Sequence, residues 1–161
     1  MSRFLALSLF ALSAAAQPYS FTLPQGWVRL AKTSSSGCVL LVPHQDSLVS
    51  ICGHHTDPTT ETVEHALRVS PDELIQQYRT HEIGESAHLR SNSVAWSRVA
   101  GQMALSAIVD YSRGNKDMSE LIVWLQSDAT RMHVKVRVPQ QTDMDSVRRL
   151  IQPLLNSIRV E

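Results

Sequence analysis

The chain has 161 residues, and its 15 basic side chains balance its 15 acidic ones, so the formal net charge is zero at pH 7. This balance gives no argument for a nucleic-acid partner or for binding to an anionic membrane surface, both of which favour a basic protein. Beyond the N-terminal region, no segment is long and apolar enough to span a membrane.

Residues 1–16 have the pattern of a cleaved secretory signal peptide. Arg3 precedes the uncharged run 4–12, and small residues then lead to an A-x-A-type cleavage site after Ala16. The apolar run is shorter than the ~20 residues that a transmembrane helix needs. We therefore predict an exported protein, periplasmic or secreted, in which residues 17–161 form a single domain.

The two cysteines, Cys38 and Cys52, are predicted to form a disulfide, because an exported chain meets an oxidising compartment. They lie in two apolar, β-branched runs that are typical of a hairpin. In the register that opposes the two cysteines, Val39 lies opposite Ile51, which gives one coherent apolar face. Closing this loop would stabilise the fold by roughly 3 kcal/mol. The alternative is two buried free thiols.

The polar stretch 54–62 follows and is predicted to be a loop. A helix is then predicted over 70–82. Ser70 is a good N-cap, Pro71 suits the first helical position, and Glu73 completes a capping box.

Four strands are predicted in series after this helix. They cover residues 93–100, 103–111, 119–126 and 131–138. A type II′ turn led by Gly101 is expected between the first two strands. The last strand alternates apolar and polar residues, which is typical of an antiparallel strand with one wet face.

The final helix is predicted over 142–158. Thr142 or Asp143 can cap its N-terminus, and Pro153 is expected to kink or end it. Its apolar stripe consists of Val147, Leu150, Ile151, Leu154 and Leu155. The order of elements predicts an α+β fold in which helices flank an antiparallel β-sheet.

Three segments, in order, resemble the PsbP-like family, which shares its fold with Mog-type Ran-binding proteins. The segment YSFTLPQGW resembles the family's F-x-x-P-x-G-W opening. The segment VAGQMALSAIVDY resembles its G-x-x-A strand, and IQPLLNSIRVE resembles its closing helix and end. The resemblance runs from Tyr19 to Glu161. It implies an α/β/α sandwich and a non-enzymatic accessory or binding role in an exported bacterial protein.

His54, His55 and Asp57 are a candidate metal site, because imidazole and carboxylate groups suit zinc, copper or nickel. Adjacent residues of an extended strand point to opposite sides, so both rings reach one ion only from a loop. The alternative is a set of solvated loop histidines.

Arg131, His133, Lys135 and Arg137 are a candidate surface for an anion or an acidic partner, because they project from one face of a strand. The alternative is a solvated face whose cations pair with neighbouring carboxylates.

The three tryptophans, Trp27, Trp96 and Trp124, are predicted to pack in the core or on a sheet face, with Trp124 on the same face as Ile122.

No catalytic constellation is recognisable, and no serine lies in a G-x-S-x-G motif. We therefore expect a non-enzymatic, exported domain that acts through contact with a protein or small-molecule partner and needs no cofactor. Two alternatives stay open: a metal-binding module that uses the candidate histidine site, and a hydrolase with an unrecognised site.

Overall fold

A computed structural model describes residues 19–30, 38–43, 47–55, 86–126 and 130–160. The described strands are β1 (Tyr19–Ser20), β2 (Val28–Arg29), β3 (Val39–Val42), β4 (Leu48–His55), β5 (His88–Leu89), β6 (Ala95–Val99), β7 (Gln102–Arg113), β8 (Lys116–Gln126), β9 (Thr130–Pro139) and β10 (Arg159–Val160). The described helix is α3 (Met144–Ser157). The predicted signal peptide, 1–16, and the predicted helix, 70–82, lie outside these residues.

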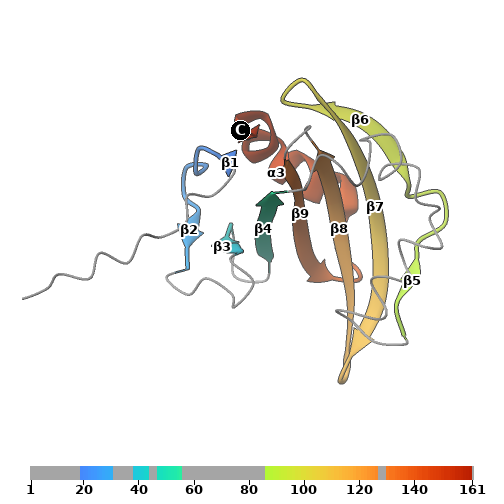
Figure 1. The fold of residues 1–161 in the computed structure, drawn as a ribbon. Coiled ribbons are helices and arrows are strands. Elements are labelled where there is room, and N and C mark those ends of the chain that lie inside the picture. The colour runs from blue at the N-terminus through green and yellow to red at the C-terminus, as the bar shows by residue number, and fades with distance from the viewer. Residues whose placement is uncertain (1–18, 31–37, 44–46, 56–85, 127–129, 161) are drawn as a thin grey trace, which may run out of the picture.

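An antiparallel sheet of eight strands dominates the described part of the chain. Its order is β2-β3-β4-β9-β8-β7-β5, and β6 also pairs with β7. β7 and β8 form the long, twisted hairpin at the centre of Figure 1, and a separate ribbon joins β1 to β10. The fold is therefore α+β, as predicted, with the sheet as its main component.

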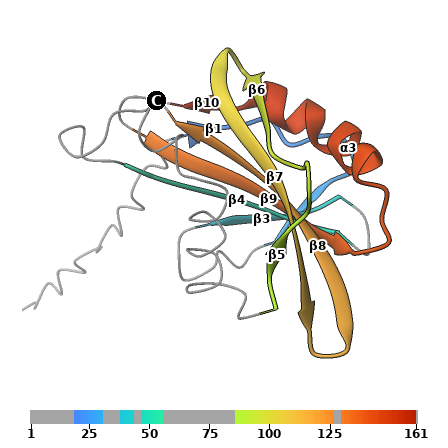
Figure 2. The ribbon, with the colours of Figure 1, turned by 90° about the vertical axis from the view of Figure 1, so that its right-hand side faces the viewer.

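Helix α3 lies across one face of this sheet, which we call the α3 face (Figure 2). Every second residue of the central strands meets the helix there and forms the main core. Fully buried examples are Leu121 from β8, Val134 from β9, and Ile151 and Leu154 from α3. The apolar stripe predicted for the last helix is thus confirmed as the surface that packs on the sheet.

The cap of α3 was predicted correctly, and its last residue, Ser157, lies next to the predicted end at 158. The Asp143 carboxylate accepts hydrogen bonds from the backbone N–H groups of Asp145 and Ser146. The helix continues through Pro153 to Ser157. Pro153 is exposed, whereas Leu154 and Leu155 after it are buried in the core. Burial of these two leucines holds the last turn in place and outweighs the hydrogen bond that proline removes.

The opposite face of the sheet, which we call the far face, has a smaller apolar cluster. It consists of Ala87, Val109, Tyr111 and Ile122, with Leu89, Met118 and Trp124 packed against it. The predicted neighbours Trp124 and Ile122 therefore do share a face. Helices on both faces, as in the expected sandwich, are seen only in part, since the one helix in the described residues covers the α3 face.

The cysteine hairpin has the predicted register. Val39 pairs with Ile51 and Leu41 with Val49, and a disulfide joins Cys38 to Cys52. The predicted turn between β6 and β7 is wrong in type and position. Its two central residues are Ala100 and Gly101, with φ of 50° and 84°, as in a type I′ turn.

Candidate functional site

A cleft opens between α3 and the strands β6, β7 and β8 on the α3 face. Its volume is about 250 Å³. The lining residues are Ala95, Ser97, Arg98, Val99, Ser106, Leu121, Val123, Arg148, Ile151, Gln152 and Leu155. Its apolar lining includes Leu121, Val123 and Ile151 of the main core. Its polar lining consists of arginine, serine and glutamine side chains. An apolar lining with a few polar groups is typical of a binding site.

Strand β6 forms one wall of this cleft, and it is an edge strand. Among the described strands, it pairs only with β7. Val99 pairs with Gln102 across the two-residue turn, so the backbone N–H and C=O groups of Trp96 and Arg98 face away from β7. An open edge of this kind is able to pair with another strand.

The exposed apolar side chains of the described residues include two on the β6–β7 hairpin. Trp96 is 50% exposed and Met103 is 41% exposed. The prediction that all three tryptophans pack is therefore wrong for Trp96, because its strand lies at the edge of the sheet. Trp27, in contrast, is buried in the main core.

The predicted basic stripe lies on β9, on the far face, but β9 is a central strand rather than a solvated one. It is paired with β4 on one side and with β8 on the other. Lys135 is only 6% exposed. Arg131 and His133 occupy the corresponding positions further along the strand, opposite Gln126 and Trp124. The structure thus places the stripe as predicted, while the expected wet face is wrong at Lys135.

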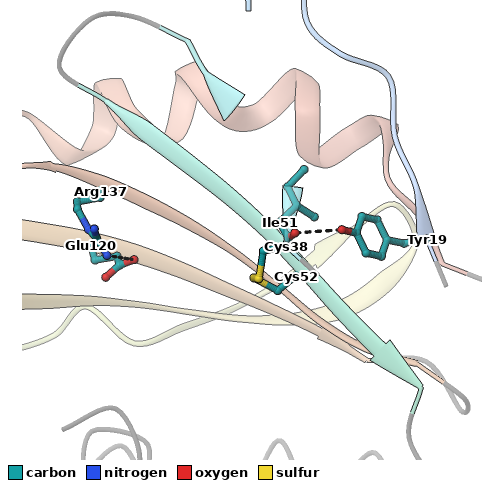
Figure 3. Close-up of a disulfide and its surroundings, with 6 residues drawn as sticks. All are labelled: Tyr19, Cys38, Ile51, Cys52, Glu120 and Arg137. Carbon is teal, nitrogen blue, oxygen red and sulfur yellow. Dashed lines mark hydrogen bonds and ion pairs between the residues drawn. A yellow bond between two sulfur atoms is a disulfide. The ribbon is translucent and has the colours of Figure 1, made fainter. Parts of the chain in front are cut away.

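Arg137, the last member of the stripe, is held by residues that the sequence analysis did not single out. Its Nη2 lies 3.8 Å from Oε1 of Glu120, which is directly opposite on β8 (Figure 3). Its guanidinium carbon lies 6.0 Å from the centre of the Tyr111 ring. The side chains of Arg137 and Glu120 are 34% and 3% exposed. This is the pairing with a neighbouring carboxylate that the sequence left as an alternative.

Burial raises the pKa of the Tyr111 phenol above its ordinary value, and the Glu120 carboxylate raises it further, while Arg137 acts in the opposite direction. Tyr111 therefore stays a neutral phenol at ordinary pH. No periodic pattern in the sequence indicates this group of Tyr111, Glu120 and Arg137, because each member comes from a different strand.

A second polar cluster links Arg90, next to the edge strand β5, to Asp110 of β7 and Ser119 of β8. Arg90 donates to both oxygens of Asp110 at 2.9 and 2.6 Å, and to Ser119 Oγ at 2.9 Å. Ser119 Oγ donates to Asp110 at 2.6 Å. Every oxygen here is already engaged by a neighbour, and the described residues place no histidine within hydrogen-bond distance of Ser119. The arrangement has the geometry of a structural ion pair.

The candidate metal residues are only partly described. His54 and His55 are the last two residues of β4, opposite Arg131 and Thr130 of β9, so the loop predicted to begin at His54 starts later. Asp57 lies outside the described residues. Within the part of the chain that the structure describes, no group of three or more histidine, cysteine, aspartate or glutamate side chains is placed to hold a metal ion.

The described residues also contain no helix that is long and apolar enough to cross a membrane. The disulfide is the clearest chemical feature of the candidate surfaces. It joins Cys38, directly before β3, to Cys52 of β4 (Figure 3). Cys52 lies opposite His133 of the basic stripe.

No protein-family model matches the chain, and no curated protein matches it. Solved structures of other proteins do match the chain. LpqN, which is involved in cell envelope biogenesis of Mycobacterium tuberculosis, is 12% identical with a TM-score of 0.61, covering 93% of this chain and 87% of that one. Cyanobacterial PsbP from Synechocystis is 15% identical with a TM-score of 0.60, covering 89% and 87%.

A protein from Bacteroides thetaiotaomicron is 7% identical with a TM-score of 0.58. The match covers 89% of this chain but only 45% of that protein, so this chain spans less than half of its length. At these identities the likeness concerns the fold. Together with the strand order and the helix packing described above, it shows that the chain has the PsbP-like fold, as the sequence resemblance implied.

Proposed function

We propose that this protein is an exported, non-enzymatic binding domain that docks an extended segment of a partner protein on the open edge of β6. The observation that carries the proposal is the open edge of β6, whose residues Ala95, Ser97 and Val99 line the apolar cleft while Trp96 lies half exposed on the other face of the strand. An incoming strand would pair with the outward backbone groups of β6, and alternate side chains would enter the cleft.

The local chemistry supports a protein segment as the occupant. Strand addition supplies affinity through main-chain hydrogen bonds, which need no particular sequence, and the pocket selects the side chain that enters it. The cleft volume of about 250 Å³ lies below the range of about 300–1,000 Å³ of typical small-molecule sites. It suits one apolar side chain better than a whole ligand.

Two features support a location outside the cytoplasm. The Cys38–Cys52 disulfide persists in an oxidising compartment. One protein of similar structure takes part in cell envelope biogenesis. We therefore place the mature protein, 17–161, in the periplasm or the surrounding medium.

N-terminal sequencing tests this location. The sequence of protein recovered from those fractions should begin at Gln17. An intact leader on a protein with reduced thiols would contradict this location.

Site-specific photo-crosslinking in living cells tests the docking site. A photoreactive amino acid at position 96 should give a covalent adduct with a protein partner. The same amino acid at position 149, on the solvent side of α3, is the matched control and should give none. Equal adducts at both positions would contradict a site on β6.

A synthetic peptide that covers the crosslinked segment then tests the mode of binding. Trp96→Pro removes an outward N–H group without breaking the ladder with β7, and Ser106→Phe fills the cleft. Each should weaken peptide binding by about tenfold or more, which corresponds to at least about 1.4 kcal/mol of binding free energy. Unchanged affinity in both variants would overturn the proposal.

A further inference from the structure

The tip of the β7–β8 hairpin lies far from β6 and carries two cations (Figure 1). Arg113 and Lys116 flank the Gly114–Asn115 turn and are paired directly opposite each other. Like charges that face each other across a ladder destabilise it. Both side chains are exposed, and neither has an ion-pair partner in the part of the chain that the structure describes. The hairpin therefore tolerates a repulsion that a bound anion would remove.

A third cation faces the same region from β9. Arg137 and Lys116 line one hollow of about 350 Å³ on the far face. The remaining lining residues are Val42, Ser47, Leu48, Met118 and Pro139. The hollow thus has cations in one part of its wall and, apart from Ser47, apolar side chains in the rest.

Arg137 is also positioned in advance for a ligand. Glu120 and the Tyr111 ring hold its guanidinium, yet the nearest carboxylate oxygen is 3.8 Å away, beyond ordinary hydrogen-bond distance. Its Nε is buried without a hydrogen-bond acceptor. A buried donor with no acceptor is costly, and about a third of the side chain still faces solvent at the hollow. An anion in the hollow would accept hydrogen bonds from the exposed part of the guanidinium.

The charges around the hollow favour a dianion. Lys116 and Arg137 line the hollow, Arg113 lies directly opposite Lys116 on the β7–β8 ladder, and Glu120 beside Arg137 supplies one buried carboxylate. Asp117 does not offset them, because it alternates to the α3 face, where its carboxylate accepts a hydrogen bond from Ser112 Oγ at 2.7 Å. Arginine and lysine together are the side chains that recognise phosphate groups.

From these observations, we propose that the far-face hollow binds a phosphate monoester that carries an apolar chain, with Arg137, Lys116 and Arg113 holding the phosphate and the walls Leu48, Met118 and Pro139 contacting the chain. The site uses no residue of β6 and no residue of the cleft under α3. The two proposals therefore succeed or fail separately.

Titration of the full mature protein with hexyl phosphate, followed by backbone NMR shifts and calorimetry, tests the proposal. We expect a dissociation constant below about 1 mM. The largest shifts should fall on the turn 113–116 and on Arg137. Inorganic phosphate lacks the chain and hexanol lacks the charge, so each should bind at least about tenfold more weakly. Equal binding of inorganic phosphate would overturn the assignment of an amphipathic ligand.

The variants separate loss of the site from loss of the fold. The double variant Arg113→Gln/Lys116→Gln changes only exposed turn residues and should weaken binding by about tenfold or more. Arg137→Gln should do the same, with its fold checked by the NMR spectrum. The matched control Arg149→Gln removes an exposed arginine of α3 and should bind as the parent does. Affinity unchanged in the double variant would overturn the proposal.

Vesicles that contain an anionic phospholipid distinguish a membrane surface from a single bound molecule. The proposal expects hexyl phosphate to compete with any vesicle binding. Binding to vesicles without binding to hexyl phosphate would overturn it, because general attraction to a charged surface would then suffice.

Discussion

The two faces of the sheet come from the same strands but have different chemistry. On the α3 face, the alternating residues of β4, β8 and β9 are apolar and pack against the helix in one continuous core. On the far face, a cluster of four buried residues lies beside Glu120, Lys135 and Arg137, of which the first two are buried. One face has the character of a core, and the other resembles a site that holds charged groups in fixed positions.

This difference shows what side-chain alternation does and does not reveal. Alternation assigned each residue of β9 to the correct face, because the side-chain period of a strand is two. It did not reveal whether the polar face is wet. Buried charged groups are expensive unless they are paired, and on the far face the buried Glu120 pairs with Arg137.

The largest effect should come from the apolar face. Leu154 of α3 is fully buried in the main core, so Leu154→Ala should lower the free energy of unfolding by about 4 kcal/mol through lost burial and a residual cavity. Urea unfolding measures this loss of stability. Leu150→Ala, at a partly buried position of the same helix, is the control and should cost less. Equal losses would show that full burial of Leu154 adds nothing over the partial burial of Leu150.

The disulfide gives the next largest effect, on the far face. Replacing both cysteines with serine removes a crosslink over a separation of 14 residues and should cost about 3 kcal/mol. Urea unfolding of the oxidised parent, the reduced parent and the double variant measures this loss of stability. If the reduced parent and the double variant are as stable as the oxidised protein, the crosslink does not hold β3 to β4.

The Arg90–Asp110 pair should make stability depend on acid pH. Burial acts to raise the Asp110 pKa, but hydrogen bonds from Arg90 and Ser119 outweigh it and hold the pKa below its usual value. A carboxyl with a lowered folded-state pKa stabilises the protein above its unfolded pKa of about 3.9. That contribution is lost as the pH falls from there through the folded-state pKa.

Arg90→Gln should therefore cost about 2 kcal/mol at neutral pH, because it breaks charged hydrogen bonds to a buried carboxylate. It should also flatten the fall in stability below about pH 4. Thermal unfolding of parent and variant across pH 2–7 measures both effects. An unchanged slope would assign the acid sensitivity to other carboxyl groups.

The smallest effect should come from the edge hairpin. Ala100 has a positive φ, which disfavours any residue with a Cβ other than asparagine or aspartate. Ala100→Asn creates an Asn-Gly type I′ turn and should stabilise the protein by about 0.5–1 kcal/mol. The same change at Gln102, which follows the turn in β7, is the control and should bring no gain.

Local patterns predicted the hairpins and the last helix because each depends on residues close in sequence. The cysteine register followed from opposing two short runs, and the cap of α3 from one aspartate. Pro153 does not end the helix, because its local cost is offset by leucines buried against strands far away in the chain. The turn type at Ala100 depends on the twist of the flanking strands.

The candidate sites were harder to predict. The basic stripe was visible as a period of two, but its partners Glu120 and Tyr111 lie 17 and 26 positions from Arg137 in the sequence. Only the strand order brings them together. The exposure of Trp96 depends in the same way on β6 lying at an edge.

The ribbon that joins β1 to β10 brings Tyr19 beside Val160, so both ends of the folded body emerge at one pole. The Gly114–Asn115 turn lies at the opposite pole (Figures 1 and 2). A tether fused to either end would thus present the hairpin tip outward, away from whatever holds the molecule. Force applied through the two ends would act on the short β1–β10 ribbon first and open it pair by pair, before reaching the long strands.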